Sequence, residues 1–130
     1  MPLIRDDRLH DRKILVVEDD PAIQRALVEI LGDDSGYDVH VAGDGRSALA
    51  LLKTPPPPVL ILLDLMMPDM DGAAFIAQRG RDPALADIPV CLMTATGRHT
   101  PQMPGVAGVL PKPFGIDALL AVVERFARKP

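Results

Sequence analysis

One stretch, VLILLDLMMPDMDG at residues 59–72, constrains the fold of this chain more than any other. Five consecutive apolar residues, Val59–Leu63, run directly into Asp64. A run of branched aliphatic side chains of that length is typical of a central strand in a parallel sheet that helices cover on both faces. Pro68 and Gly72 predict a tight loop just beyond the strand. The sequence therefore predicts a carboxylate held on a rigid strand end, beneath a loop.

Apolar runs of similar character alternate with amphipathic patterns along the rest of the chain. We expect further strands at Ile14–Val17, Tyr37–Ala42, Pro89–Thr94 and Val106–Leu110. We expect helices from Pro21 to Gly32, from Asp44 to Leu52, from Gly72 to Gly80 and from Ile116 to Arg128. Asp20 and Asp44 suit helix caps, and Gly32 suits a helix end. This repeated alternation predicts an open α/β sheet with right-handed crossovers.

Polar side chains follow four of the five predicted strands. They are Glu18, Asp19 and Asp20 after the first strand, Asp64 after the third, Thr94 at the end of the fourth and Lys112 after the fifth. Ligands of open α/β sheets bind beyond the carboxyl ends of the strands. We therefore expect these side chains to converge on one acidic pocket.

A pocket of this kind favours a divalent cation. The carboxylates of Glu18, Asp19 and Asp64 repel one another when they are held within a few ångströms, unless a cation or protons intervene. Mg²⁺ relieves that repulsion, because carboxylate, carbonyl and water oxygens are its preferred ligands. We expect Asp69 and Asp71 to shape the loop rather than to bind the metal.

The same pocket would contain the groups that phosphoryl transfer to Asp64 requires. They are a carboxylate nucleophile, a metal, a hydroxyl from Thr94 and a positive charge from Lys112. Phosphorylation would replace a group carrying one negative charge by a group carrying about two. Drawing Thr94 and Lys112 toward that group would move the loops after the last two strands, which is a route from modification to an altered surface.

Four motifs in this order resemble the receiver domain of bacterial two-component response regulators, including the single-domain chemotaxis regulators. They are EDD at 18–20, LLDLMMPDMDG at 62–72, MTA at 93–95 and KPF at 112–114. The resemblance covers residues 13–128. It implies a doubly wound, flavodoxin-like fold with five parallel strands in the order 2-1-3-4-5.

The resemblance also implies a role for each residue of the pocket. Asp64 would accept a phosphoryl group from a sensor histidine kinase or a phosphotransfer protein, and the chain would act as a signalling switch toward a downstream protein. Such a protein only phosphorylates and dephosphorylates itself, so it is not expected to be a turnover enzyme. The implied ligands of Mg²⁺ are Glu18, Asp19, Asp64 and the Met66 carbonyl, whereas Thr94 and Lys112 would bind the phosphoryl oxygens. The Lys112–Pro113 bond is often cis in this family.

Two features depart from the family pattern. Val109 stands three residues before Lys112, where receivers commonly carry Tyr or Phe. The span after Thr94 is short and contains Pro101 and Pro104, which an ordinary helix would not tolerate. We therefore expect the fourth helix to be shortened or replaced by a loop, and the signal to leave by an unusual route.

Composition narrows the setting in which the chain works. The net charge is −4 and Trp is absent, which argues against a nucleic-acid surface on this domain. Cys91 is the only cysteine, so no internal disulfide can form and a reducing cytoplasm is expected. No apolar segment reaches membrane-spanning length. We expect a flexible arm at 1–12, one receiver domain at 13–130, and a monomer or weak dimer.

Two other functions stay open at this point. The first is a phosphate sink or a constitutive protein-binding adaptor whose output is uncoupled from phosphorylation, which Val109 and the proline-interrupted span after Thr94 favour. The second is a small Mg²⁺-dependent phosphatase with Asp64 as nucleophile. Dehalogenase-like phosphatases place a second Asp two residues after the first, and Met66 stands there in this chain, so the general acid is missing.

Overall fold

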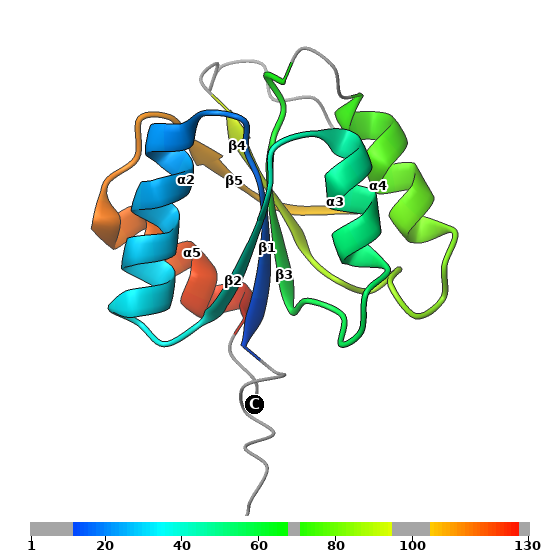
Figure 1. Ribbon diagram of the computed structural model, residues 1–130, viewed down its shortest axis with the longest axis horizontal. Helices are drawn as coiled ribbons and strands as arrows, with labels where there is room; N and C mark the ends of the chain where they lie inside the picture. Colours follow the sequence, from blue (N-terminus) through cyan, green and yellow to red (C-terminus); the bar gives the residue numbers. More distant parts are fainter. Residues whose placement is uncertain (1–11, 68–70, 95–104, 128–130) are drawn as a thin grey trace, which may run out of the picture.

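Five parallel strands form one sheet at the centre of the protein in the computed structural model, which describes residues 12–67, 71–94 and 105–127 (Figure 1). The strands are β1 (Lys13–Val17), β2 (Asp38–Ala42), β3 (Leu60–Asp64), β4 (Val90–Thr94) and β5 (Val106–Pro111). Their order across the sheet is β2-β1-β3-β4-β5, with every neighbouring pair parallel. This order confirms the predicted doubly wound fold.

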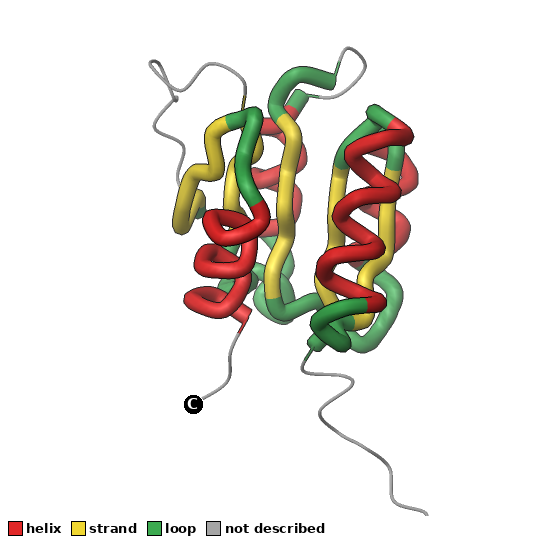
Figure 2. The backbone as a smooth tube through the Cα atoms, turned by 90° about the vertical axis from the view of Figure 1, so that its left-hand side faces the viewer, coloured by secondary structure: helices red, strands yellow, loops and turns green. Residues whose placement is uncertain are grey.

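Helices cover both faces of the sheet. They are α2 (Pro21–Leu27), which continues as a π-helical segment, η1 (Val28–Asp33), followed by α3 (Gly45–Leu52), α4 (Gly72–Gly80) and α5 (Ile116–Ala127). Figure 2 looks onto α2 and α5, which lie in front of the sheet. The α3 and α4 helices cover the opposite face, as Figure 1 shows.

The two faces of the sheet carry separate hydrophobic clusters, because successive side chains of a strand point to opposite sides. Ile14 and Val16 of β1 pack with buried residues of α2, η1 and α5. Leu15 and Val17 pack with buried residues of α3 and α4. Both β1 and β3 are buried along their whole length, so the strand that ends in Asp64 cannot shift without disturbing both clusters.

Aspartate caps begin three of the helices. A side-chain oxygen of Asp20 accepts a hydrogen bond from the Ala22 N–H (2.9 Å), and Asp44 accepts one from the Ser47 N–H (2.7 Å). Asp71 accepts from two N–H groups at the start of α4. Each carboxylate satisfies helix N–H groups that have no partner within the helix. Asp71 therefore has a structural role, and α4 has the bounds that its sequence predicts.

The end of the helix after β1 differs from the expectation, because Gly32 does not end it. The chain passes through Gly32 in a wide π-helical turn, in which the Asp34 N–H donates to the Glu29 carbonyl (3.0 Å). The left-handed residue is Gly36, with φ of 79°. There the Tyr37 N–H donates to the Leu31 carbonyl (2.9 Å), a pattern like that of a glycine-terminated helix.

The helix that we expect to be shortened or replaced by a loop is the one between β4 and β5, not α4. That segment, residues 95–104, lies outside the described residues. Most of the predicted N-terminal arm, residues 1–11, also lies outside the described residues.

Arg12, the last residue of the predicted arm, packs against the turn before β2. Its guanidinium carbon lies 4.2 Å from the centre of the Tyr37 ring, and its Nη2 donates to the Ser35 carbonyl (2.9 Å).

Among the residues that the structure describes, no helix combines the length and the apolar character needed to cross a membrane.

Candidate functional site

The carboxyl ends of four strands bring the predicted site residues to one edge of the sheet, at the top of Figure 1. Glu18 directly follows β1, Asp64 ends β3, Thr94 ends β4 and Lys112 directly follows β5. Three of these side chains are buried: Glu18 is 1% exposed, Asp64 is 3% exposed and Thr94 is 2% exposed. Asp19 is exposed at the mouth of the site.

The three predicted metal-binding carboxylates lie close together. One oxygen each from Glu18, Asp19 and Asp64 can be chosen so that all three lie within 4.8 Å of one another. Such a cluster of hard, charged oxygens fits a hard divalent cation, and the exposed Asp19 leaves the cluster open to solvent. The fourth predicted ligand is the backbone carbonyl of Met66, two residues beyond Asp64. Met66 itself is 60% exposed, so its side chain is not part of the core.

Lys112 places one ammonium group between two of these carboxylates. Its Nζ lies 2.7 Å from Oε1 of Glu18 and 3.3 Å from Oδ2 of Asp64. The Lys112 backbone N–H donates to the Thr94 carbonyl (2.6 Å), which ties the loop after β5 to the end of β4. The Lys112–Pro113 bond is cis. One residue therefore connects the ends of β1, β3, β4 and β5.

A backbone N–H group holds the second oxygen of each buried carboxylate. Oδ1 of Asp64 accepts from the Met66 N–H (2.9 Å), and Oε2 of Glu18 accepts from the Asp20 N–H (3.1 Å). Each carboxylate thus has one oxygen toward Lys112 and one toward its own loop. These bonds fix the orientation of both groups, because a charged acceptor forms strong hydrogen bonds.

Burial and charge act against each other on the ionisable groups of the site. Burial raises the pKa of Glu18 above its usual value, although hydrogen bonds from Lys112 and the Asp20 amide oppose that rise. Burial acts to lower the pKa of Lys112, but the hydrogen bond to Glu18 and the charge of Asp64 outweigh it, so the Lys112 pKa lies above its usual value. Lys112 therefore keeps its charge at neutral pH.

One contact of the site was not predicted from the sequence. Gln24, on α2, donates from Nε2 to the backbone carbonyl of Glu18 at 2.5 Å. In the sequence, Gln24 is one of several polar residues of an amphipathic helix, and no motif distinguishes it. Only the packing of α2 against the end of β1 shows that its amide reaches the loop.

Comparison with known proteins gives a consistent match over most of the chain. The family model of the response regulator receiver domain matches residues 14–124. The DNA-binding dual master transcriptional regulator RpaA of Synechocystis is 40% identical over 121 residues, which are 90% of this chain and 49% of that relative. The chain spans about half the length of the curated relatives that it matches.

Solved structures match over a similar extent. The chemotaxis response regulator CheY4 of Vibrio cholerae is 30% identical with a TM-score of 0.77, over 88% of this chain and 97% of that one. The receiver domain of a sensor histidine kinase from Pseudomonas aeruginosa, which has a magnesium ion coordinated in its active site cleft, is 24% identical with a TM-score of 0.81. That match covers 91% of this chain and 98% of that one, and it shows the same fold.

Replacing Lys112 by Met should destabilise the protein by about 2 kcal/mol at pH 7, because it leaves the buried Glu18 carboxylate without its cation. The folded pKa of Glu18 already lies above the unfolded value of about 4.3, and this change raises it further. A group whose pKa is higher in the folded state stabilises the fold when it is protonated. For Glu18 this contribution to the free energy of unfolding is complete below the unfolded-state pKa, and it is lost as the pH rises through the folded-state pKa. The free energy of unfolding that Lys112→Met loses relative to the parent should therefore become smaller as the pH is lowered from 7 to 5.

Urea denaturation without divalent cations measures this deficit at each pH. Lys53→Met, which removes an exposed lysine just after α3, is the control and should change stability little at either pH. A deficit for Lys112→Met that is equal at pH 5 and pH 7 would contradict the role assigned to the pair.

Proposed function

Because the chain belongs to the response regulator receiver domain family, we propose that Asp64 accepts a phosphoryl group from a histidine kinase or phosphotransfer protein in a Mg²⁺-dependent reaction. The observation that carries the proposal is the placing of the Asp64 carboxylate. It ends a strand that is buried on both sides, 3.3 Å from the Lys112 ammonium and beside two further carboxylates. A nucleophile held in this way needs little reorganisation before it reacts.

In phosphoryl transfer, the protein contributes mainly by positioning the reacting groups and by stabilising the negative charge of the phosphoryl oxygens. An oxygen of Asp64 attacks phosphorus, a P–O bond forms, and the P–N bond to the donor imidazole breaks as the imidazole leaves. Glu18, Asp19, Asp64 and the Met66 carbonyl would hold Mg²⁺, which when bound offsets charge on the phosphoryl oxygens. The Lys112 ammonium and the Thr94 hydroxyl would bind those oxygens at the ends of β5 and β4.

The added charge also explains how a switch could work. The acyl phosphate carries about one more negative charge than the Asp64 carboxylate, so it competes with Glu18 for the Lys112 ammonium. Because the Lys112 N–H is bonded to the Thr94 carbonyl, a shift of Lys112 is transmitted to the end of β4. We propose that a downstream protein binds this edge of the sheet and that its affinity depends on the position of Lys112 and of the end of β4.

Incubation with a small acyl or amide phosphodonor and Mg²⁺ should add one phosphoryl group to the parent protein, as measured by intact mass. Asp64→Asn should gain none, and chelation of Mg²⁺ should prevent the gain in the parent. The matched control is Asp71→Asn, which alters an exposed carboxylate in the α4 cap and should be phosphorylated like the parent. A phosphoryl gain in Asp64→Asn would show that another residue is the acceptor.

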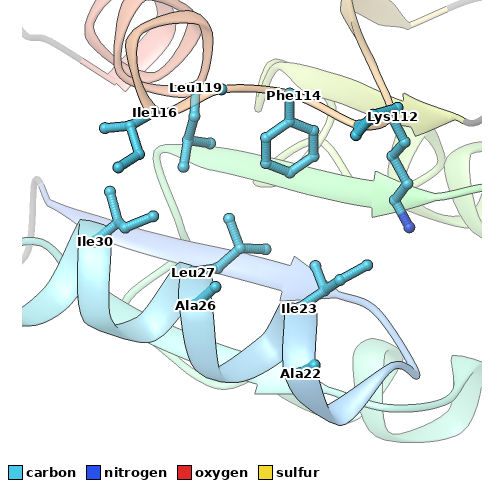
Figure 3. A pocket seen from close by; sticks show the side chains of 11 residues that line it. Ala22, Ile23, Ala26, Leu27, Ile30, Lys112, Phe114, Ile116 and Leu119 are labelled. Atoms are coloured by element: carbon cyan, nitrogen blue, oxygen red, sulfur yellow. The ribbon is translucent and has the colours of Figure 1, made fainter.

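An apolar groove beside the site suits a protein donor. The groove, about 520 Å³ in volume, lies between α2 and the segment that joins β5 to α5, as Figure 3 shows. Its lining includes Ile23 and Leu27 on one wall and Phe114 and Ile116 on the other. Lys112, whose ammonium forms the ion pairs of the acidic site, also lines the groove, so the groove and the site are neighbours.

We propose that an amphipathic helix of the phosphodonor protein docks in this groove. A donor histidine must reach Asp64, so the donor has to cover the mouth of the site, and the groove adjoins that mouth through Lys112. Ile116, which is 56% exposed, provides apolar surface that such a helix would bury.

Ile116→Asp should slow phosphorylation by a protein donor at least tenfold while leaving phosphorylation by a small donor unchanged. The new carboxylate would face the apolar side of the docking helix, although Asp is well tolerated in the first turn of α5. Ala118→Asp places the same charge on an exposed position of that turn outside the groove lining and serves as the control. Equal rates for both variants with the protein donor would rule out docking at this groove.

A phosphate sink or constitutive adaptor is the alternative function that one observation favours. Val109, half-buried in β5 opposite Leu92, stands where receivers commonly carry an aromatic residue. The two functions differ in whether affinity for the downstream partner changes on phosphorylation. An unchanged affinity would favour the adaptor.

We also propose a cytoplasmic location for the domain. Cys91 is a buried free thiol, and burial raises its pKa to about 11. It therefore stays protonated and unreactive at neutral pH. Because Cys91 is also the only cysteine of the sequence, the chain has no internal disulfide, as is usual for proteins of a reducing compartment.

A further inference from the structure

The peptide group between Glu18 and Asp19 is held by a side chain from α2. Gln24 Nε2 donates to the Glu18 carbonyl at 2.5 Å. The same nitrogen lies beside the turn after β2, where a Cβ added to Gly43 would approach it to 3.4 Å. The Gln24 amide therefore lies between the loop after β1 and the turn after β2.

Gln24 contacts the main chain on both sides of Asp19. Its side chain binds the carbonyl of Glu18. Its backbone N–H donates to the carbonyl of Asp20 (2.9 Å), which is the first intrahelical bond of α2 and does not depend on the side chain. The Glu18 N–H is bonded in turn to the Ala42 carbonyl (3.0 Å). The peptide group on the other side of Asp19 is held by Glu18, whose Oε2 accepts a hydrogen bond from the Asp20 N–H (3.1 Å). Asp19 is thus an exposed residue between two hydrogen-bonded peptide groups.

We propose that Gln24 is a positioning residue for the metal site, acting through the main chain of Asp19. The inference rests on the proposed function, in which Glu18, Asp19 and Asp64 hold Mg²⁺. Fixing the Glu18–Asp19 peptide keeps the Asp19 carboxylate near the other two before the cation arrives. The cation then does not have to order the loop when it binds.

The side-chain chemistry makes this role specific. The Glu18 carbonyl is an acceptor, so it needs a donor at this position, and the amide of Gln24 supplies one. Met has nearly the same length and no donor. Glu also has nearly the same shape, but its carboxylate would face the carbonyl with an acceptor while adding negative charge near the metal site.

Isothermal calorimetry of Mg²⁺ binding tests the proposal with two variants. Gln24→Met should bind Mg²⁺ about tenfold more weakly than the parent, the size of effect typical for a residue that orients a metal ligand. Gln24→Glu should also bind more weakly. If the charge of the side chain were all that mattered, the added carboxylate of Gln24→Glu would attract Mg²⁺ and tighten its binding. Tighter Mg²⁺ binding by Gln24→Glu would therefore overturn the proposal.

Gln78→Met, the same change at an exposed position of α4, is the matched control and should bind Mg²⁺ like the parent. Asp19→Asn provides a further readout, because it should weaken binding less in the Gln24→Met background than in the parent. Equal effects of Asp19→Asn in both backgrounds would mean that Gln24 does not act through Asp19.

The outcomes separate this inference from the function on which it rests. A parent protein that does not bind Mg²⁺ would overturn both. A parent that binds Mg²⁺, together with a folded Gln24→Met variant of equal affinity, would overturn the positioning role alone.

Discussion

Two buried carboxylates at the ends of neighbouring strands set the central constraint on this structure. Glu18 and Asp64 are almost fully buried, and such groups are costly to keep charged unless a cation faces them. The Lys112 ammonium faces both, at 2.7 Å and 3.3 Å. The positions of β1, β3 and the loop after β5 are therefore tied together by charge as well as by hydrogen bonds of the sheet. The proposed phosphoryl group would enter at this point, where added negative charge must compete for the same ammonium.

The rest of the fold keeps this arrangement rigid on one side and open on the other. The buried strands and their two hydrophobic clusters hold the backbone at Asp64, while Asp19 and the groove beside Lys112 face solvent. A rigid acceptor with an open approach suits transfer from a second protein. In our proposal Gln24 extends the same principle to Asp19, the one carboxylate of the cluster that lies outside the core, because its amide holds the carbonyl of the preceding residue, Glu18.

Much of this could be predicted from the sequence, because the informative signals are local. The apolar run before Asp64 predicts a buried strand, and the helical pattern from Gly72 to Gly80 predicts α4, although the cap at Asp71 became evident only from the structure. The order of acids, Thr94 and Lys112 along the chain predicts that they meet, since parallel strands bring their carboxyl ends to one edge. Two features could not be predicted. The helix continues past Gly32 because Gly36 and the Tyr37–Leu31 hydrogen bond complete the turn, and Gln24 reaches Glu18 only through packing of α2 on the sheet.

Locating the phosphoryl group tests the central claim most directly. Borohydride reduces an aspartyl phosphate to homoserine and leaves free carboxylates intact, so peptide mass spectrometry of the reduced protein identifies the acceptor. The account predicts homoserine at position 64 and unmodified residues at 18 and 19. Homoserine at position 19, or a phosphorylated protein that yields none, would contradict the assignment of Asp64 as the acceptor.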